Sequence, residues 1–149
     1  KKAGGAVGSP SVTMVAQRLV QIQLIVIYVH SGVVKTAGSA WQDGSALYYA
    51  LSNGQYQRSP ALVEPILSSP LGQAICAAAT HTTLIWEAGF AVLLLWRPTR
   101  VLAILLGVGV HLGIGIFMNV GHFVWIMLWC YLAFLPAGSL DRLRLRPQG

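Results

Sequence analysis

The sequence predicts an all-α integral membrane protein, with about four transmembrane helices and a long outer loop that carries a short interfacial helix. Of the 149 residues, 55% are hydrophobic and only 9% are charged, whereas about a quarter would be charged in a soluble domain. Four apolar stretches approach the ~20 residues that cross a bilayer. The basic residues gather at one end of these stretches, as they do in membrane proteins.

The predicted spans cover residues 14–35, 71–96, 101–119 and 122–136 of a transmembrane domain at residues 13–136. Residues 1–12 are expected to be a flexible linker or the start of a fragment of a longer protein. Residues 137–149 are expected to form a basic cytoplasmic tail.

The distribution of Lys and Arg predicts the orientation. With both termini in the cytoplasm, eight of the ten basic residues lie on the cytoplasmic side. Lys35 and Arg58 lie on the outer side, which is periplasmic or lumenal. The net charge of +6 is then explained by membrane orientation and attraction to anionic lipid, so lipid is the expected partner and nucleic acid is not.

The first span carries a polar stripe. Gln17, Gln21, Tyr28, Ser31 and Lys35 recur at helical spacing. Such a stripe cannot face lipid, so it either holds neighbouring helices together or lines a polar pocket. The sequence leaves both interpretations open.

Lys35 is the candidate catalytic residue. An amine at the outer end of an apolar segment is costly, and desolvation favours the neutral form that a general base needs. The alternative is a snorkelling residue that fixes the helix end at the lipid headgroups. We weigh the two interpretations equally.

Residues 36–69 are expected to form the outer loop, with residues 45–52 as its short interfacial helix. Trp41 and Tyr48 are predicted to join an aromatic belt at the membrane surface. The alternative is that they stack on a ligand.

Glu87 lies in the middle of the second span, where an ionised carboxylate costs several kcal/mol. We therefore expect it to be protonated or paired with Gln21 or Arg18, from the inner half of the first span. At ~1.5 Å per residue, Lys35 lies more than ~20 Å away in depth. This count excludes Lys35 as its partner.

The third span contains Gly109 and Gly113, a small-xxx-small pattern that lets helix backbones approach closely. His30, His81 and His111 fall in the outer half of three different helices, which raises the hypothesis of a haem site. No pair has ligand spacing within one helix, so no metal site is predicted and haem is the weaker cofactor hypothesis.

The fourth span is aromatic. Its side chains, which include Trp125, Trp129 and Tyr131, are expected to face lipid or a partner.

The run QLIVIYVHSGVVKTAGSAWQDGSALYYAL resembles the core of the horizontally transferred transmembrane (HTTM) domain, the bacterial relatives of the vitamin K-dependent gamma-glutamyl carboxylase. The stretches TLIWEAGFAVLLLWRPTR and VHLGIGIFMNVGHFVWIMLWCYLAFLP are similar to later helices of that family. The first match is carried by Tyr28, Ser31, Gly32, Lys35, Trp41, Asp43 and Gly44. The resemblance implies that Lys35 takes a proton from a reduced quinone of the vitamin K type. Trp41 and Tyr48 would flank its ring.

Two functional classes follow. We favour an accessory subunit that packs against other transmembrane subunits of a larger respiratory or photosynthetic complex, since the chain is expected to lack the upstream helices of that family. The alternative is a hydroquinone-dependent oxygenase or carboxylase-like enzyme with Lys35 as its general base. A haem- or quinone-binding helical bundle, with His30 and His111 as contacts, is a third hypothesis. The enzyme hypothesis requires Lys35 to lie in a closed, partly apolar pocket near Trp41 or Tyr48.

Overall fold

A computed structural model describes residues 12–135, in which helices are joined by short turns and one isolated β-bridge links Gln57 with Met118. The expected linker (all but Val12) and the expected basic tail lie outside the described residues. The helices are α1 (Val12–Thr36), α2 (Ser39–Gln42), α3 (Ala46–Ser52), α4 (Pro60–Leu67), α5 (Pro70–Leu93), α6 (Arg97–Phe117), α7 (Phe123–Tyr131) and the 3₁₀-helix η1 (Leu132–Phe134).

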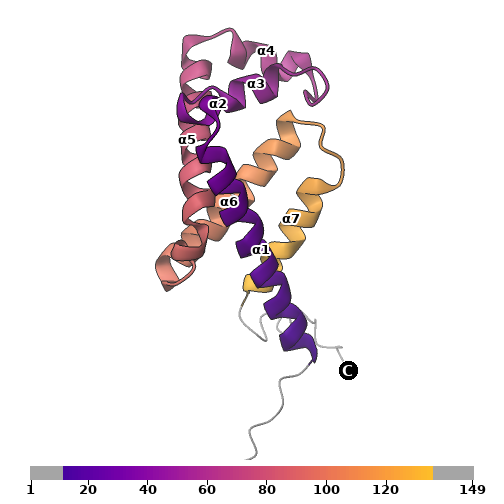
Figure 1. The fold of residues 1–149 in the computed structure, drawn as a ribbon. Helices are drawn as coiled ribbons and strands as arrows, with labels where there is room; N and C mark the ends of the chain where they lie inside the picture. The colour runs from indigo at the N-terminus through magenta and orange to yellow at the C-terminus, as the bar shows by residue number, and fades with distance from the viewer. Residues whose placement is uncertain (1–11, 136–149) are drawn as a thin grey trace, which may run out of the picture.

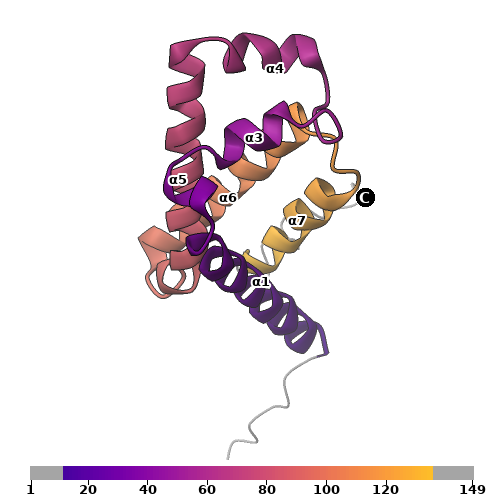
Figure 2. The same ribbon diagram turned by 45° about the horizontal axis from the view of Figure 1, so that its top comes forward.

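The long helices α1, α5, α6 and α7 run alternately up and down (Figures 1 and 2). The short helices α2, α3 and α4 gather at one end, beyond the C-terminus of α1. The turn between α5 and α6 lies at the opposite end, together with the start of α1. The first half of α5 therefore packs against this cap of short helices, and its second half packs against α1 and α6.

The number of membrane spans differs from the expected four. Met14–Thr36 and Arg97–Phe117 are each long and apolar enough to cross a membrane, and Pro60–Leu67 with Pro70–Leu93 qualifies as a pair bent by 96°. Phe123–Phe134 is apolar but shorter. The described chain thus has two or three candidate spans, because the first half of α5 is polar and α7 has only nine residues. The expectation of four is not confirmed.

The expected outer loop contains three helices rather than one. Pro60 and Pro70 are the first residues of α4 and α5, where the missing proline N–H costs nothing. The Ser69 hydroxyl accepts a hydrogen bond from Gly72 N at 3.0 Å and caps α5. A Cβ at Gly72 would collide with the backbone of Ile66, so the sharp bend between α4 and α5 requires glycine.

The turn between α2 and α3 is built by Asp43 and Gly44. Asp43 Oδ1 accepts hydrogen bonds from the hydroxyl and the backbone N–H of Ser45, which lower the pKa of the exposed Asp43 carboxyl. Gly44 adopts φ +84°, a conformation that favours glycine.

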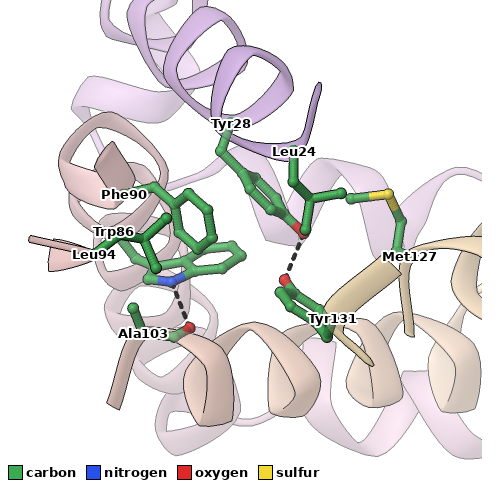
Figure 3. Packing of buried hydrophobic residues seen from close by; sticks show 8 residues of the cluster. All are labelled: Leu24, Tyr28, Trp86, Phe90, Leu94, Ala103, Met127 and Tyr131. Carbon is green, nitrogen blue, oxygen red and sulfur yellow. Dashed lines mark hydrogen bonds between the residues drawn. The ribbon is translucent and has the colours of Figure 1, made fainter. Parts of the chain in front are cut away.

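Most of the core lies between α1, α5, α6 and α7 (Figure 3). Trp86 donates its indole N–H to Ala103 O at 2.9 Å, which ties α5 to α6. The Tyr28 and Tyr131 hydroxyls point toward one another across the core. Its buried residues are Leu24, Tyr28, Trp86, Phe90, Leu94, Ala103, Met127 and Tyr131.

A second, smaller core fixes the cap to α5. Leu51, Val63 and Cys76 form it, from α3, α4 and α5 respectively. Buried Thr80 accepts from Leu47 N at 3.1 Å and donates to Cys76 O at 2.8 Å. The start of α3 is therefore held on the side of α5.

The inner half of the polar stripe on α1 serves helix packing. Gln17 donates to Ala133 O at 2.8 Å, and Gln21 donates to the same carbonyl at 2.6 Å. Carbonyls at a helix end have no partner within the helix, so the two amides satisfy groups that would otherwise be unpaired.

The aromatic side chains of α7 divide between surface and core. Trp125 and Trp129 are 62% and 70% exposed, as expected for a surface that faces lipid or a partner. Tyr131 is only 4% exposed and faces the core. The expectation for Tyr131 is therefore wrong, because its hydroxyl finds a buried partner in Tyr28.

Candidate functional site

The site begins at a close crossing of α1 and α5. A Cβ at Gly32 would collide with the backbone of Glu87 and Ala88, so the two helices touch there without an intervening side chain. Lys35 lies one helical turn beyond Gly32. The crossing thus brings the end of α1 next to Glu87.

Lys35 and Glu87 form an ion pair. Lys35 Nζ lies 2.6 Å from both Glu87 Oε1 and Oε2. Glu87 is 7% exposed, and the Lys35 side chain is 22% exposed. The carboxylate is thereby compensated in an otherwise apolar environment.

This pairing corrects the expectation that Gln21 or Arg18 would compensate Glu87 and that Lys35 lay too far away. Arg18 donates to Gln21 Oε1 at 3.0 Å, and Gln21 donates to the end of α7. The estimate of depth failed because it assumed that the C-terminus of α1 and the N-terminus of α5 lie at the same depth in the membrane. In fact α5 continues past the end of α1 along the cap of short helices (Figure 1). Glu87, in the second half of α5, therefore lies beside Lys35.

Trp41 completes the surroundings of the amine. Lys35 Nζ lies 4.4 Å from the centroid of the Trp41 ring, a cation–π distance. The Gln42 side-chain amide donates to Thr36 O at 2.8 Å and ties α2 to the end of α1. Trp41 therefore contacts Lys35 directly.

The ion pair lines a cavity of about 780 Å³, to which all seven α-helices of the described residues contribute side chains. Its wall is mainly aliphatic and aromatic, with side chains such as Leu47, Ile114 and Phe117. The polar side chains in this wall are Tyr28, Ser31, Lys35, Thr80, Thr82, Thr83, Glu87 and His111. An apolar cavity with a few convergent polar groups is typical of small-molecule sites.

Three buried polar side chains form a hydrogen-bonded series at one wall of the cavity. His111 is 3% exposed, and its Nδ1 lies 2.8 Å from Gly107 O. Its Nε2 lies 3.5 Å from the Tyr28 hydroxyl, which in turn lies 2.5 Å from the Tyr131 hydroxyl. His111 and Tyr28 both line the cavity.

The glycines of α6 have different functions from those expected. A Cβ at Gly107 would collide with the Tyr131 hydroxyl and the Trp86 ring. This glycine therefore lets the side chains of Tyr131 and Trp86 pack directly against the backbone of α6. A Cβ at Gly109 or Gly113 would meet nothing within 4 Å. Among the described residues, the small-xxx-small pair makes no close helix contact and instead widens the cavity that it lines.

The structure does not bring all the predicted site residues together. Lys35, Trp41 and His111 line the cavity, whereas Tyr48 lines a shallow groove beside Glu64. His30 is exposed on α1 and does not line the cavity. Within residues 12–135, no three His, Cys, Asp or Glu side chains are grouped as metal ligands would be.

Sequence analysis missed Glu87 as a site residue. The usable signal was Gly32, because a glycine inside a membrane helix marks a close approach of another backbone. Its partner on α5 could not be read from the sequence, since that depends on how far α5 extends past α1.

Comparison with known proteins places nearly the whole chain in one family. The family model described as the HTTM domain matches residues 5–138. A curated Bacillus subtilis protein, "Uncharacterized protein YitO", is 40% identical over 58 residues, which cover 35% of this chain and 18% of that protein. The chain thus matches less than a fifth of the length of this relative. No solved structure matches.

Proposed function

Because this chain belongs to the HTTM domain family, we propose that it forms the ring-binding, proton-accepting site of a hydroquinone-dependent, carboxylase-like membrane enzyme. The observation that carries this proposal is the Lys35–Glu87 pair in the wall of an apolar cavity of about 780 Å³. The accessory-subunit hypothesis, which the sequence favoured, has no comparable observation in its support.

The polarity of a reduced quinone matches that of the cavity wall. Its ring is apolar and suits the aliphatic wall, and its hydroxyls need the few polar groups that the wall offers. Exposed apolar side chains cover the outer faces of α1 and α6, so a lipid-soluble ligand would reach the cavity from the bilayer.

The ion pair would act on one hydroxyl of the ring. Lys35 can accept a proton only as a neutral amine, and the Glu87 carboxylate at 2.6 Å is placed to take the proton that Lys35 must lose. Transfer of that proton to Glu87 would leave Lys35 as the neutral amine that a general base requires. Lys35 Nζ would then receive the hydroxyl proton, and Trp41 would hold the amine in place.

The first test measures quinol oxidation. The full protein in lipid nanodiscs should consume oxygen with a reduced menaquinone analogue above the rate of empty nanodiscs. Lys35→Ala should lower this rate by about 10²–10⁴-fold, the usual contribution of a general base, while circular dichroism stays unchanged. An unchanged rate in a folded Lys35→Ala variant would refute the function of Lys35.

The second test fills the cavity. Gly113→Leu places a side chain in open space that belongs to the cavity, whereas Gly89→Leu places one in open space outside it. We expect Gly113→Leu to weaken binding of the reduced quinone analogue at least tenfold and Gly89→Leu to leave it unchanged. Equal affinities for both variants would contradict binding in this cavity.

A further inference from the structure

The hydrogen bonds of His111 define which of its nitrogens can bind a ligand. Nδ1 lies 2.8 Å from Gly107 O, and a carbonyl oxygen can only accept, so Nδ1 carries the proton. In the neutral ring, Nε2 is then an acceptor. The ring of Phe123 packs against the imidazole with centroids 5.7 Å apart, which helps to keep this orientation.

The acceptor at Nε2 is only weakly engaged. Its partner, the Tyr28 hydroxyl, lies 3.5 Å away, beyond the usual range for a strong hydrogen bond. The same hydroxyl lies 2.5 Å from the Tyr131 hydroxyl. His111 is 3% exposed and lines the cavity, so its Nε2 is a buried acceptor that has only this long hydrogen bond among the described residues.

The two polar ends of the cavity lie along one face of α1. Tyr28, beside His111, and Lys35 are seven residues apart, which is two helical turns or about 10 Å along the axis. Ser31 lies between them, and all three line the cavity. A six-membered ring with oxygens at opposite positions, plus a hydrogen bond of about 2.8 Å at each end, spans a length of the same order.

We infer that His111 Nε2 is a second ligand anchor, and that the cavity selects a ring with hydroxyl groups at opposite ends. One hydroxyl faces the Lys35–Glu87 pair, and the other donates to His111. This inference rests on the proposed function and adds to it the orientation of the ring and the residue that distinguishes a diol from a simple phenol.

The experiment compares two probes. Dissociation constants are measured by microscale thermophoresis, in nanodiscs under anaerobic conditions, for the naphthalene diol with hydroxyls at opposite positions of one ring and for the mono-hydroxy naphthol. The wild-type protein should bind the diol about five- to tenfold more tightly, the usual effect of one hydrogen bond. His111→Phe should abolish this preference, mainly through weaker diol binding.

A conservative variant separates recognition from structure. His111→Gln keeps a side-chain acceptor and should retain part of the preference for the diol, which a merely structural function of His111 would not predict. If His111→Phe does not fold, loss of the preference in His111→Ala, with partial retention in His111→Gln, supports the same conclusion.

The outcomes distinguish the two proposals. Equal binding of both probes to the wild-type protein, or a diol preference that survives in His111→Phe, overturns the anchor while leaving the cavity as a phenol site. Failure of both probes to bind the wild-type protein overturns the proposed function and the anchor with it.

Discussion

The partly buried Lys35 ammonium and the buried Glu87 carboxylate form an ion pair in this molecule. Lys35 Nζ is held by both oxygens of Glu87 and by the face of Trp41. Removing one partner of such a pair leaves the other charge uncompensated, which is usually more costly than removing both. The pair can therefore be tested through stability as well as through activity.

We expect Glu87→Gln and Lys35→Met each to destabilise the protein by about 2–4 kcal/mol, and the double variant to lose clearly less than the sum. The measurement is a double-mutant cycle from equilibrium unfolding in mixed detergent micelles. Additive losses would contradict the direct contact between the two side chains.

At the level of the helices, two kinds of contact hold α1 in place: a glycine that allows a close backbone contact, and glutamine side chains that bind carbonyl groups. Gly32 allows α1 to meet the backbone of α5. Gln17 and Gln21 on the same helix donate to the carbonyl of Ala133 in η1, which follows α7. α1 is thus joined to α5 near its C-terminus and to η1 near its N-terminus.

The helix crossing gives a sharp prediction. Gly32→Val should destabilise the protein by about 1–3 kcal/mol or more, because the new side chain has no room against the Ala88 backbone. Gly89→Val, in open space on α5, supplies the control. Similar unfolding curves for the two variants would argue against a backbone contact at Gly32.

The glutamine contacts predict a different pattern. The double change Gln17→Leu and Gln21→Leu should cost about 1–2 kcal/mol by leaving carbonyls of Ala133 and Leu135 without their donors. Gln23→Leu, at an exposed position on the same helix, should cost little or nothing. Thermal unfolding followed by circular dichroism would compare the two variants. Equal effects of the Gln17/Gln21 double change and of Gln23→Leu would refute the capping.

At the level of the whole molecule, three of the described basic residues belong to segments at opposite ends. Arg97 and Arg100 lie in the first turn of α6, and Arg58 lies between α3 and α4. The start of α6 and the cap of short helices are at opposite ends of the molecule (Figure 1). The positive-inside rule then predicts that the α5–α6 turn faces the cytoplasm and the cap faces outward.

Cysteine labelling tests this orientation. In a background with Cys76→Ala and Cys130→Ala, a membrane-impermeant maleimide should label Arg58→Cys in intact cells and Arg100→Cys only after the cytoplasm is exposed. Labelling of both positions from the same side would contradict the proposed orientation.

The sequence by itself determined the helical class, the membrane setting and the family, because composition, helical periodicity and a short motif are local properties of the chain. It also singled out Lys35, whose function stays a prediction. It also located α1 and α6 to within a few residues. Only the tertiary structure decided that Lys35 pairs with Glu87, that Gly109 and Gly113 widen a cavity, and that residues 36–69 contain a cap of helices. These facts depend on how far each helix extends past its neighbour and on where two backbones touch, and the polarity of single residues does not encode either quantity.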